Sequence, residues 1–448
     1  MRLKIYKVVI IVYENIVREY DNALLLKAEF ERRGYKVRLV HKVFDILWMP
    51  VSAIIILPNC YNTEDFETYT YFLNSRKSIY FNLQYEQVIS ERIRKIGYHF
   101  PKGKARHIYD FCWGREWYQQ LSDDGMDSKY LSISGALHLD FMRPEFAFFY
   151  LTRKEIAQKY HLKEDKKWLL YISGFTYVEN SSIEKYTAHE FKDDEYIDRF
   201  SRLSAESQKK TLVWFEKLVT DHKEIIIIYR KHPMESGSVL LEQLFKKYPK
   251  QIFNISELSV KQWIKVCDII TTWISTSAAE VYMSGKPLYL LRPYPIEKEF
   301  DAPFYYHSDQ INSYTQLGKI LRENDKSAGF PVPETVLLSY YKIDEKPAYV
   351  KIAERIERIV RLSGTQSYCE SGFWLKRCKF LVGKNIFLKY VVKKIYQFLY
   401  FYFGLKLTNK DIRKKYMISA WEEDIKNRKD LFNQKKYEVL KRIVENKR

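Results

Sequence analysis

Three cationic residues follow the most apolar run of the sequence. Residues 224–229 (EIIIIY) predict a buried strand, since strands covered on both faces are continuously apolar. The residues that come next are Arg230, Lys231, His232 and Pro233. In an open α/β sheet, ligands bind beyond the carboxyl ends of the strands, where an arginine can hold two phosphate oxygens and a histidine can donate to the same group. The tetrapeptide is therefore a candidate phosphate site, and its simpler interpretation is a basic strand end.

A cluster of hydroxyl residues follows a second strand-like run at residues 269–273. Its members are Ser275, Thr276 and Ser277, and Glu280 comes one turn later. One hydroxyl is enough to cap a helix, whereas three of them beside the free amides of a helix start could hold a phosphate. Glu280 either complements the helix dipole or accepts hydrogen bonds from a ribose diol. Because the two clusters follow neighbouring strands of one half of the chain, we interpret both as parts of a nucleotide site.

Carboxylates stand in the loop after the first apolar run, residues 7–13. Glu14 follows it directly, and Arg18, Glu19 and Asp21 come soon after. A carboxylate at the end of a strand is well placed to remove the proton of an acceptor hydroxyl. We predict Glu14 or Glu19 as that general base and Arg18 as a contact for phosphate or carboxylate. Capping of the next helix is the alternative role for these acids, and Asp21 is the expected cap.

Short β-branched runs alternate with helical patterns along two stretches of the chain. In the first stretch, strands are predicted at residues 7–13, 36–40, 53–57 and 78–82, with an amphipathic helix at residues 21–33. In the second, strands are predicted at residues 168–173, 224–229, 252–254, 269–272 and 287–292. This order predicts parallel, doubly wound sheets. We therefore expect an α/β fold of two Rossmann-like domains facing a cleft, residues 1–145 and 146–365, with a basic, aromatic helical extension at residues 366–448.

Much of the formal net charge of +19 lies near the C-terminus. Residues 374–415 contain twelve Lys or Arg and one acid, and the apolar residues between them are rich in aromatic rings. On a helix this pattern gives an apolar face framed by cations, which favours attachment to an anionic membrane surface. A helix pair packed back on the two domains is the alternative. No apolar stretch reaches the roughly 18 residues of a membrane span, so we expect a cytoplasmic protein, peripheral at the inner face of the cell membrane.

Other kinds of chemistry lack their motifs. The sequence has no G-x-x-x-x-G-K-[ST], G-x-G-x-x-G, G-x-S-x-G or H-E-x-x-H pattern, which argues against kinases, dehydrogenases, hydrolases and zincins. The nine His and five Cys show no metal-ligand spacing, so we expect no metal and no obligatory cofactor. We also expect no nucleic-acid partner, because no nucleic-acid-binding module is recognised. A non-enzymatic nucleic-acid-binding protein, suggested by charge alone, is the distant alternative.

Several blocks of the sequence, taken in order, resemble the bacterial surface carbohydrate biosynthesis proteins. The blocks are residues 18–26 (REYDNALLL), 31–37 (ERRGYKV), 112–114 (CWG), 140–145 (DFMRPE), 230–233 (RKHP) and the run from Trp263 through the hydroxyl cluster to Pro293. The resemblance covers roughly residues 5–310. It implies a GT-B glycosyltransferase, related by motif to capsule Kdo transferases, bacterial sialyltransferases and teichoic-acid glycerophosphotransferases. It also implies donor contacts at His232 and at Ser275, Thr276 and Ser277.

The residues and this resemblance together predict a metal-independent glycosyltransferase. Its substrates would be a cytidine- or uridine-linked sugar and a growing surface polysaccharide, such as capsule, or a glycolipid. Arg230, Lys231 and the helix dipole would stabilise charge on the departing phosphate, and Glu14 or Glu19 would deprotonate the acceptor. Polyol-phosphate transfer and sugar-nucleotide epimerisation on the same fold are the alternatives.

Overall fold

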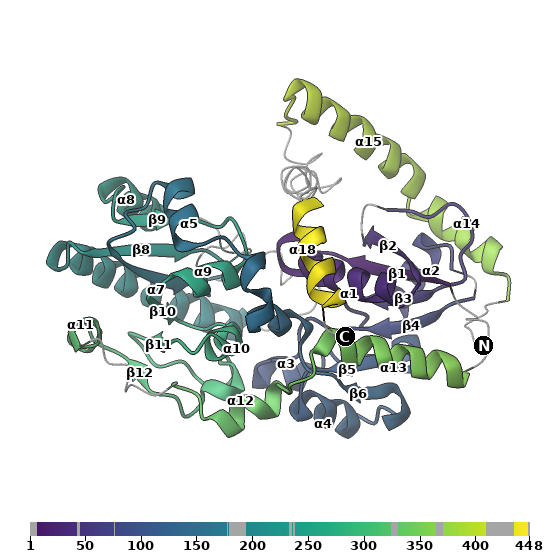
Figure 1. Ribbon diagram of the computed structural model, residues 1–448, viewed down its shortest axis with the longest axis horizontal. Coiled ribbons are helices and arrows are strands. Elements are labelled where there is room, and N and C mark those ends of the chain that lie inside the picture. The colour runs from purple at the N-terminus through teal and green to yellow at the C-terminus, as the bar shows by residue number, and fades with distance from the viewer. Residues whose placement is uncertain are drawn as a thin grey trace. The chain divides into compact units, whose positions relative to one another are not determined.

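The computed structural model divides the chain into two compact units (Figure 1). It describes residues 7–42, 45–75, 77–176, 178, 194–232, 235, 238–323, 330–363, 371–408 and 434–446. Unit 1 comprises Met1–Gln87, His99–Asp140 and Lys342–Arg448, and unit 2 comprises Val88–Tyr98 and Phe141–Tyr341. Each unit contains its own parallel sheet with helices, which confirms the predicted α/β fold of two Rossmann-like domains.

The sheet of unit 1 has six parallel strands in the order β2-β1-β3-β4-β5-β6. The strands are β1 (Val8–Tyr13), β2 (Lys36–His41), β3 (Ile54–Leu57), β4 (Ile79–Asn82), β5 (Tyr109–Cys112) and β6 (Leu131–Ile133). The helices of this sheet region are α1 (Asp21–Arg32), α2 (Thr63–Phe72), α4 (Arg115–Asp123) and α13 (Ala348–Ser363). Every residue of β3 is buried, as expected of a strand covered on both faces. The chain runs from β1 out to β2 and then crosses to β3 on the other side of β1, so the winding reverses between β1 and β3.

The sheet of unit 2 follows the same plan, in the order β12-β11-β10-β7-β8-β9. Its strands are β7 (Lys167–Ile172), β8 (Ile225–Arg230), β9 (Ile252–Asn254), β10 (Ile269–Thr272), β11 (Leu288–Leu291) and β12 (Gln310–Ile311). Its helices include α3 (Glu91–Ile96), α5 (Arg153–Tyr160), α7 (Asp194–Asp221), α8 (Val239–Lys247), α9 (Val260–Val266), α10 (Ala278–Met283), α11 (Tyr314–Glu323) and α12 (Glu334–Tyr340). Here the winding reverses between β7 and β10. The two reversals are the places where an open α/β sheet presents its ligand site.

Aromatic rings fix the chain where it leaves two central strands of unit 2. Trp273 follows β10, and its ring stacks on that of Phe175, which follows β7, with 4.7 Å between the centroids. Phe200 of α7 stacks on the same indole at 5.8 Å and on Phe300 at 4.6 Å. Such pairs add about 0.5–1.5 kcal/mol each to the free energy of burial. The loops after β7 and β10 are therefore held by packing as well as by the sheet.

The limits of the compact units differ from the predicted domain limits of 1–145, 146–365 and 366–448. The chain from Lys342 onward, including α13, belongs to unit 1, and Val88–Tyr98 belongs to unit 2. Asp140 explains the first difference, because its buried carboxylate accepts the amide N–H groups of Ala348 at 3.0 Å and Tyr349 at 2.8 Å at the start of α13. A buried carboxylate on these amides is a strong helix cap, and it ties α13 to unit 1.

The predicted C-terminal extension contains the described helices α14 (Phe373–Gly383), α15 (Ile386–Phe403) and α18 (Gln434–Glu445). Leu440 and Val444 of α18 are buried, and Tyr437 accepts a hydrogen bond from Lys27 of α1 at 2.9 Å. Arg377 of α14 is buried and donates to two backbone carbonyls elsewhere in unit 1. Helices α14 and α18 thus pack on unit 1, as the alternative interpretation expects. None of the described helices is both long and apolar enough to cross a membrane.

Candidate active site

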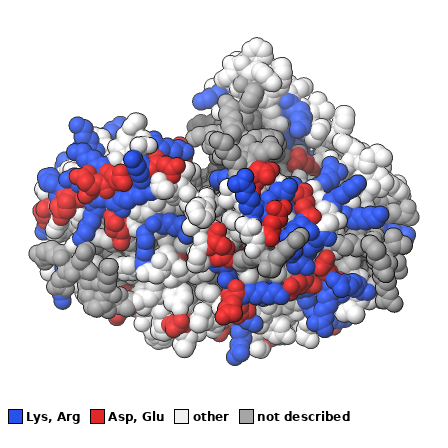
Figure 2. Space-filling view, viewed as in Figure 1, with Lys and Arg blue, Asp and Glu red and all other residues white. Residues whose placement is uncertain are grey.

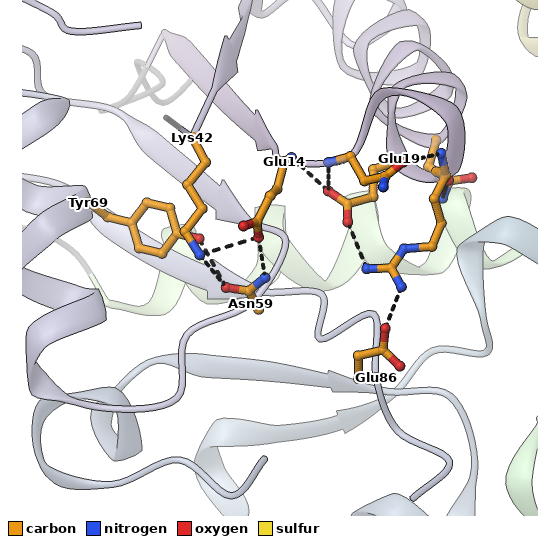
Figure 3. Close-up of polar contacts among 9 residues, drawn as sticks. Glu14, Glu19, Lys42, Asn59, Tyr69 and Glu86 are labelled. Atoms are coloured by element: carbon orange, nitrogen blue, oxygen red, sulfur yellow. Dashed lines mark hydrogen bonds and ion pairs between the residues drawn. The ribbon is translucent and has the colours of Figure 1, made fainter. Parts of the chain in front are cut away.

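Three strand ends of unit 1 meet at one carboxylate (Figure 3). Glu14 follows β1 and Asn59 follows β3, on the two sides of the winding reversal. Asn59 donates from Nδ2 to Oε2 of Glu14 at 2.9 Å. Lys42, which follows β2, donates from Nζ to the same oxygen at 3.3 Å and to Oδ1 of Asn59 at 3.0 Å. The carboxyl ends of β1, β2 and β3 therefore position Glu14 where ligands of such sheets bind.

Glu14 combines partial exposure with a stabilised negative charge. Its side chain is 42% exposed. Burial of the rest would raise the pKa of Glu14, but Lys42, Asn59 and Arg18 together outweigh burial and lower it below its ordinary value. The carboxylate is therefore ionised at neutral pH. Lys42 and Asn59 both donate to Oε2, and among the described residues no side-chain hydrogen bond reaches Oε1.

Glu19 is close to Glu14, but its carboxylate is buried and bonds to the backbone. Its side chain is 1% exposed, and its Oε2 atom accepts the amide N–H groups of Glu14 at 2.7 Å and Asn15 at 3.3 Å. Oε1 accepts from Arg18 at 3.2 Å. Burial raises the pKa of Glu19, and the Arg18 charge and the two amides oppose that rise. Glu19 is thus a buried acceptor that holds the loop after β1, which makes it a positioning residue and leaves Glu14 as the candidate base.

Arg18 lies in the segment after β1, and its positive charge is paired with carboxylates of the protein. The guanidinium is half-exposed and forms ion pairs with Glu19 and with Glu86, which follows β4 (Figure 3). Two neighbouring carboxylates reduce its attraction for a phosphate. The start of the helical segment also differs from the prediction. Asn15, and not Asp21, accepts a capping hydrogen bond, from the Arg18 amide at 3.0 Å, because a π-helical turn, η1 (Ile16–Tyr20), precedes α1.

Buried polar side chains also lie at the end of β4 and in β5. Asn82 donates to Asp110 at 2.9 Å and to the side chain of Gln84 at 3.1 Å. Burial raises the pKa of Asp110 to about 7, and the hydrogen bond from Asn82 only partly opposes it. Gln84 is buried and adopts a φ of 47°, a conformation that costs a non-glycine residue about 1–3 kcal/mol. The surrounding contacts hold the backbone in this strained conformation, among them the hydrogen bond from the Gln84 side chain to the carbonyl of Glu86 at 3.3 Å.

In unit 2 the hydroxyl cluster follows β10 at the winding reversal, but β7 lies between β10 and β8, so the two clusters do not follow neighbouring strands as predicted. Gly174 follows β7 and touches the chain after β10: a Cβ atom on it would lie 2.6 Å from the carbonyl oxygen of Ile274 and 2.7 Å from its Cγ2. Only glycine fits so close an approach. Ser275, Thr276 and Ser277 come directly after Ile274, so the two strand ends deliver them to the expected ligand position.

The backbone of this hydroxyl loop is held from beneath by a buried ion pair. Arg292 forms two parallel hydrogen bonds to Asp301, at 2.8 and 2.7 Å, and donates from Nε to the carbonyl of Trp273 at 3.1 Å. Tyr305 donates to the carbonyl of Ser275 at 2.7 Å. Ser277 occupies the cap position of α10 without a side-chain capping bond. The loop is therefore pre-organised, and the Ser277 hydroxyl is not used as a helix cap.

Two of the three basic residues at the end of β8, Arg230 and Lys231, bond to other residues of the protein. Arg230 donates to the carbonyls of Ser256 at 3.1 Å, Glu257 at 3.1 Å and Leu258 at 2.7 Å, and burial lowers the pKa of Arg230 to about 10. These contacts make it an anchor for the loop after β9. The predicted phosphate contact of Arg230 stays a prediction, and the tetrapeptide alone does not show these contacts with the loop after β9.

Lys231 is also engaged, since it forms an ion pair with Glu242 of α8 at 3.1 Å. His232 is exposed, and its amide donates to Glu235 at 3.2 Å. Pro233 lies outside the described residues. Glu235, which the sequence did not single out, is buried and also accepts from Tyr229 at 2.8 Å. A buried carboxylate thus holds the backbone amide of His232.

The role predicted for Glu280, a complement to the helix dipole or a contact for a ribose diol, stays a prediction. The carboxyl of Glu280 lies in α10 and is 5% exposed, and burial raises its pKa against the opposing charge of Lys261. A buried carboxyl does not favour contact with a ribose diol. Among the described residues, no group of His, Cys, Asp or Glu could hold a metal ion.

Comparison with known proteins gives a match in fold only. No family model matches the sequence, and no curated protein matches it significantly. The wall teichoic acid polymerase TagF is similar in structure, with a TM-score of 0.51 and 12% identity over 80% of this chain and 90% of that one. MnaA from S. aureus, in a structure with UDP, has a TM-score of 0.49 and 12% identity, covering 80% of this chain and 97% of that one. The chain therefore has a GT-B-like fold of two Rossmann-like units.

Proposed function

We propose that this chain is a glycosyltransferase that moves a sugar from a cytidine- or uridine-linked donor to a hydroxyl of a surface polysaccharide or glycolipid. The observation that carries the proposal is the carboxylate of Glu14. It is ionised and partly exposed, and it lies at the winding reversal of the unit 1 sheet. A carboxylate there suits the removal of a proton from an acceptor hydroxyl.

The reaction needs one base and one leaving group. The acceptor oxygen attacks the anomeric carbon of the donor, and the bond from that carbon to the phosphate oxygen breaks. The nucleotide leaves with the bonding electrons, and Glu14 takes the proton of the acceptor. Asn59 and Lys42 hold Oε2 of Glu14, and Oε1 would accept the proton of the hydroxyl.

Unit 2 would bind the donor. Support comes from the hydroxyl loop after β10, which lies at the second winding reversal and is fixed by Arg292 and Tyr305. The proposed phosphate contacts are His232, which is exposed after β8, and the hydroxyl of Ser277, which makes no capping hydrogen bond to α10. Arg230 and Lys231 would act by positioning, because both are bonded to the protein.

Calorimetry with cytidine and uridine mono- and diphosphates tests the donor site. His232→Ala and Ser277→Ala should each weaken nucleotide binding by about tenfold or more, the loss expected for a hydrogen bond to a charged group. His222→Ala is the matched control, since His222 precedes β8 and lies at the opposite edge of the sheet. Unchanged affinity of both variants for every nucleotide would overturn the site.

Product analysis then separates the proposed reaction from its alternatives. Sugar transfer consumes the donor only when an acceptor is present. Release of cytidine monophosphate from a polyol donor would assign polyol-phosphate transfer, and interconversion of the donor sugar without an acceptor would assign epimerisation. Sequence-specific nucleic-acid binding without nucleotide turnover would contradict all three.

A further inference from the structure

The outer surface of α15 carries a row of apolar side chains. Its members are Phe387, Val391, Ile395, Phe398 and Tyr402, whose spacing of four, four, three and four places them on one face of the helix. Four of them are more than half exposed: Phe387 (66%), Ile395 (56%), Phe398 (54%) and Tyr402 (67%). We call these five residues the outer row. A continuous exposed apolar surface of this kind marks a place that binds something.

Phe387 of the outer row lies edge-on to Trp48 of unit 1, with 6.4 Å between the ring centroids, while a second face of α15 is the buried one. That face carries Tyr396, which is buried and packs with Val392, Tyr400 and Leu407. Tyr396 also accepts the amide N–H of Leu407 at 3.4 Å. The helix therefore has one apolar face that packs with the chain just after it and a second that is mostly exposed to solvent.

Cations surround the outer row, and acids are missing from this part of the sequence. Lys389 and Lys394 on α15 are exposed, as are Lys384 before it and Lys406 after it. Residues 374–408 contain no Asp or Glu. Where Figure 1 draws α15, Figure 2 shows mainly uncharged side chains, with blue ones at the sides. The charge complements an anionic surface.

We infer that the outer row of α15 docks on the surface of an anionic lipid bilayer. The aromatic and aliphatic side chains would enter the interface between headgroups and acyl chains, and the lysines would contact lipid phosphates. The described helix is not long and apolar enough to span a bilayer, so it would lie along the surface. A second copy of the chain is a poorer occupant, because pairing two such faces would bring lysines against lysines.

Flotation of the full chain with lipid vesicles tests this inference. The protein should float with vesicles of equal parts phosphatidylcholine and phosphatidylglycerol, less with phosphatidylcholine alone, and less again at high salt. The double variant Ile395→Asp, Phe398→Asp should lose flotation. The matched control is Phe148→Asp, Val239→Asp, which changes two residues of unit 2 that are 88% and 72% exposed. It should float like the unchanged protein.

A second variant keeps the test decisive if the first disturbs folding. Lys389→Ala, Lys394→Ala removes two exposed charges, and each should lower the vesicle partition coefficient about fivefold, equivalent to about 1 kcal/mol. Equal flotation of wild type and both α15 variants would overturn the inference. So would absence of flotation on anionic vesicles, or a dimer in light scattering that the Asp variant dissociates without any lipid binding. Nucleotide binding measured on the same samples is independent, so failure here leaves the proposed function standing.

Discussion

The burial of Asp110 predicts how the stability of the protein depends on pH. The side chain is 1% exposed in β5, Asn82 donates to one of its oxygens, and the other has no hydrogen-bond partner among the described residues. Raising the pKa of this carboxyl from 3.8 to about 7 corresponds to about 4 kcal/mol of linkage free energy. Because the folded-state pKa is the higher one, the stabilising contribution is complete below pH 4 and is lost as the pH rises toward 7. Its two nearest buried thiols, Cys60 and Cys112, stay neutral, since burial raises their pKa values.

Asp110→Asn should remove this dependence, because an amide does not titrate. Of the total, about 3 kcal/mol falls between pH 5 and pH 8. For a unit of this size, 1 kcal/mol shifts the melting temperature by about 2 °C. Between pH 5 and pH 8, the melting temperature of wild type should therefore fall by about 6 °C relative to that of the variant. Thermal unfolding across this pH range measures it. Asp127→Asn is the control, since its carboxyl is exposed and its pKa is lowered by Lys129. Parallel pH profiles for wild type and Asp110→Asn would refute the reasoning.

Two further predictions concern the hydroxyl loop of unit 2. Gly174→Ala should lower stability by about 1–3 kcal/mol and weaken nucleotide binding, because its Cβ would lie 2.6 Å from the Ile274 carbonyl oxygen. Gly318→Ala in α11, with open space at its Cβ, should instead leave stability equal or raise it by up to about 1 kcal/mol, and equal unfolding of the two variants would disprove the close approach. Asp301→Ala should cost about 3–5 kcal/mol in denaturant unfolding, because it leaves the Arg292 guanidinium buried and uncompensated, and a loss below about 1 kcal/mol would rule out that pair as the anchor of the loop.

The strands and the placement of Glu14 could be predicted because both depend on local sequence. Runs such as residues 225–228 are all Ile and buried, and parallel strands place whatever follows them at one edge of the sheet. Glu14 and Ser275 followed from that rule. The surroundings of Arg230 and Glu280 did not, because hydrogen bonds to carbonyls of the loop after β9 and burial in α10 depend on the tertiary structure.

The limits of the compact units also depend on tertiary contacts. The alternation of strands and helices in the sequence predicts two sheets. The hydrogen bonds from the amides of Ala348 and Tyr349 to Asp140 could not be predicted in this way, because they join residues more than two hundred positions apart. In the extension, α18 differs from α15 in composition, since it carries Glu438 and Glu445 and one aromatic ring, Tyr437. Packing separates the two helices further, because Leu440 of α18 is buried whereas most of the outer row of α15 is exposed.

The most direct test of the central claim is a paired measurement on Glu14→Gln. Calorimetric affinity for the nucleotide reports on unit 2, and acceptor-dependent donor turnover reports on the base. We predict unchanged nucleotide affinity with turnover reduced by about 10²–10⁴-fold, the usual contribution of a general base. Glu64→Gln, which alters an exposed carboxylate of α2, should change neither. Turnover of Glu14→Gln within a few-fold of wild type would contradict the assignment of Glu14 as the base.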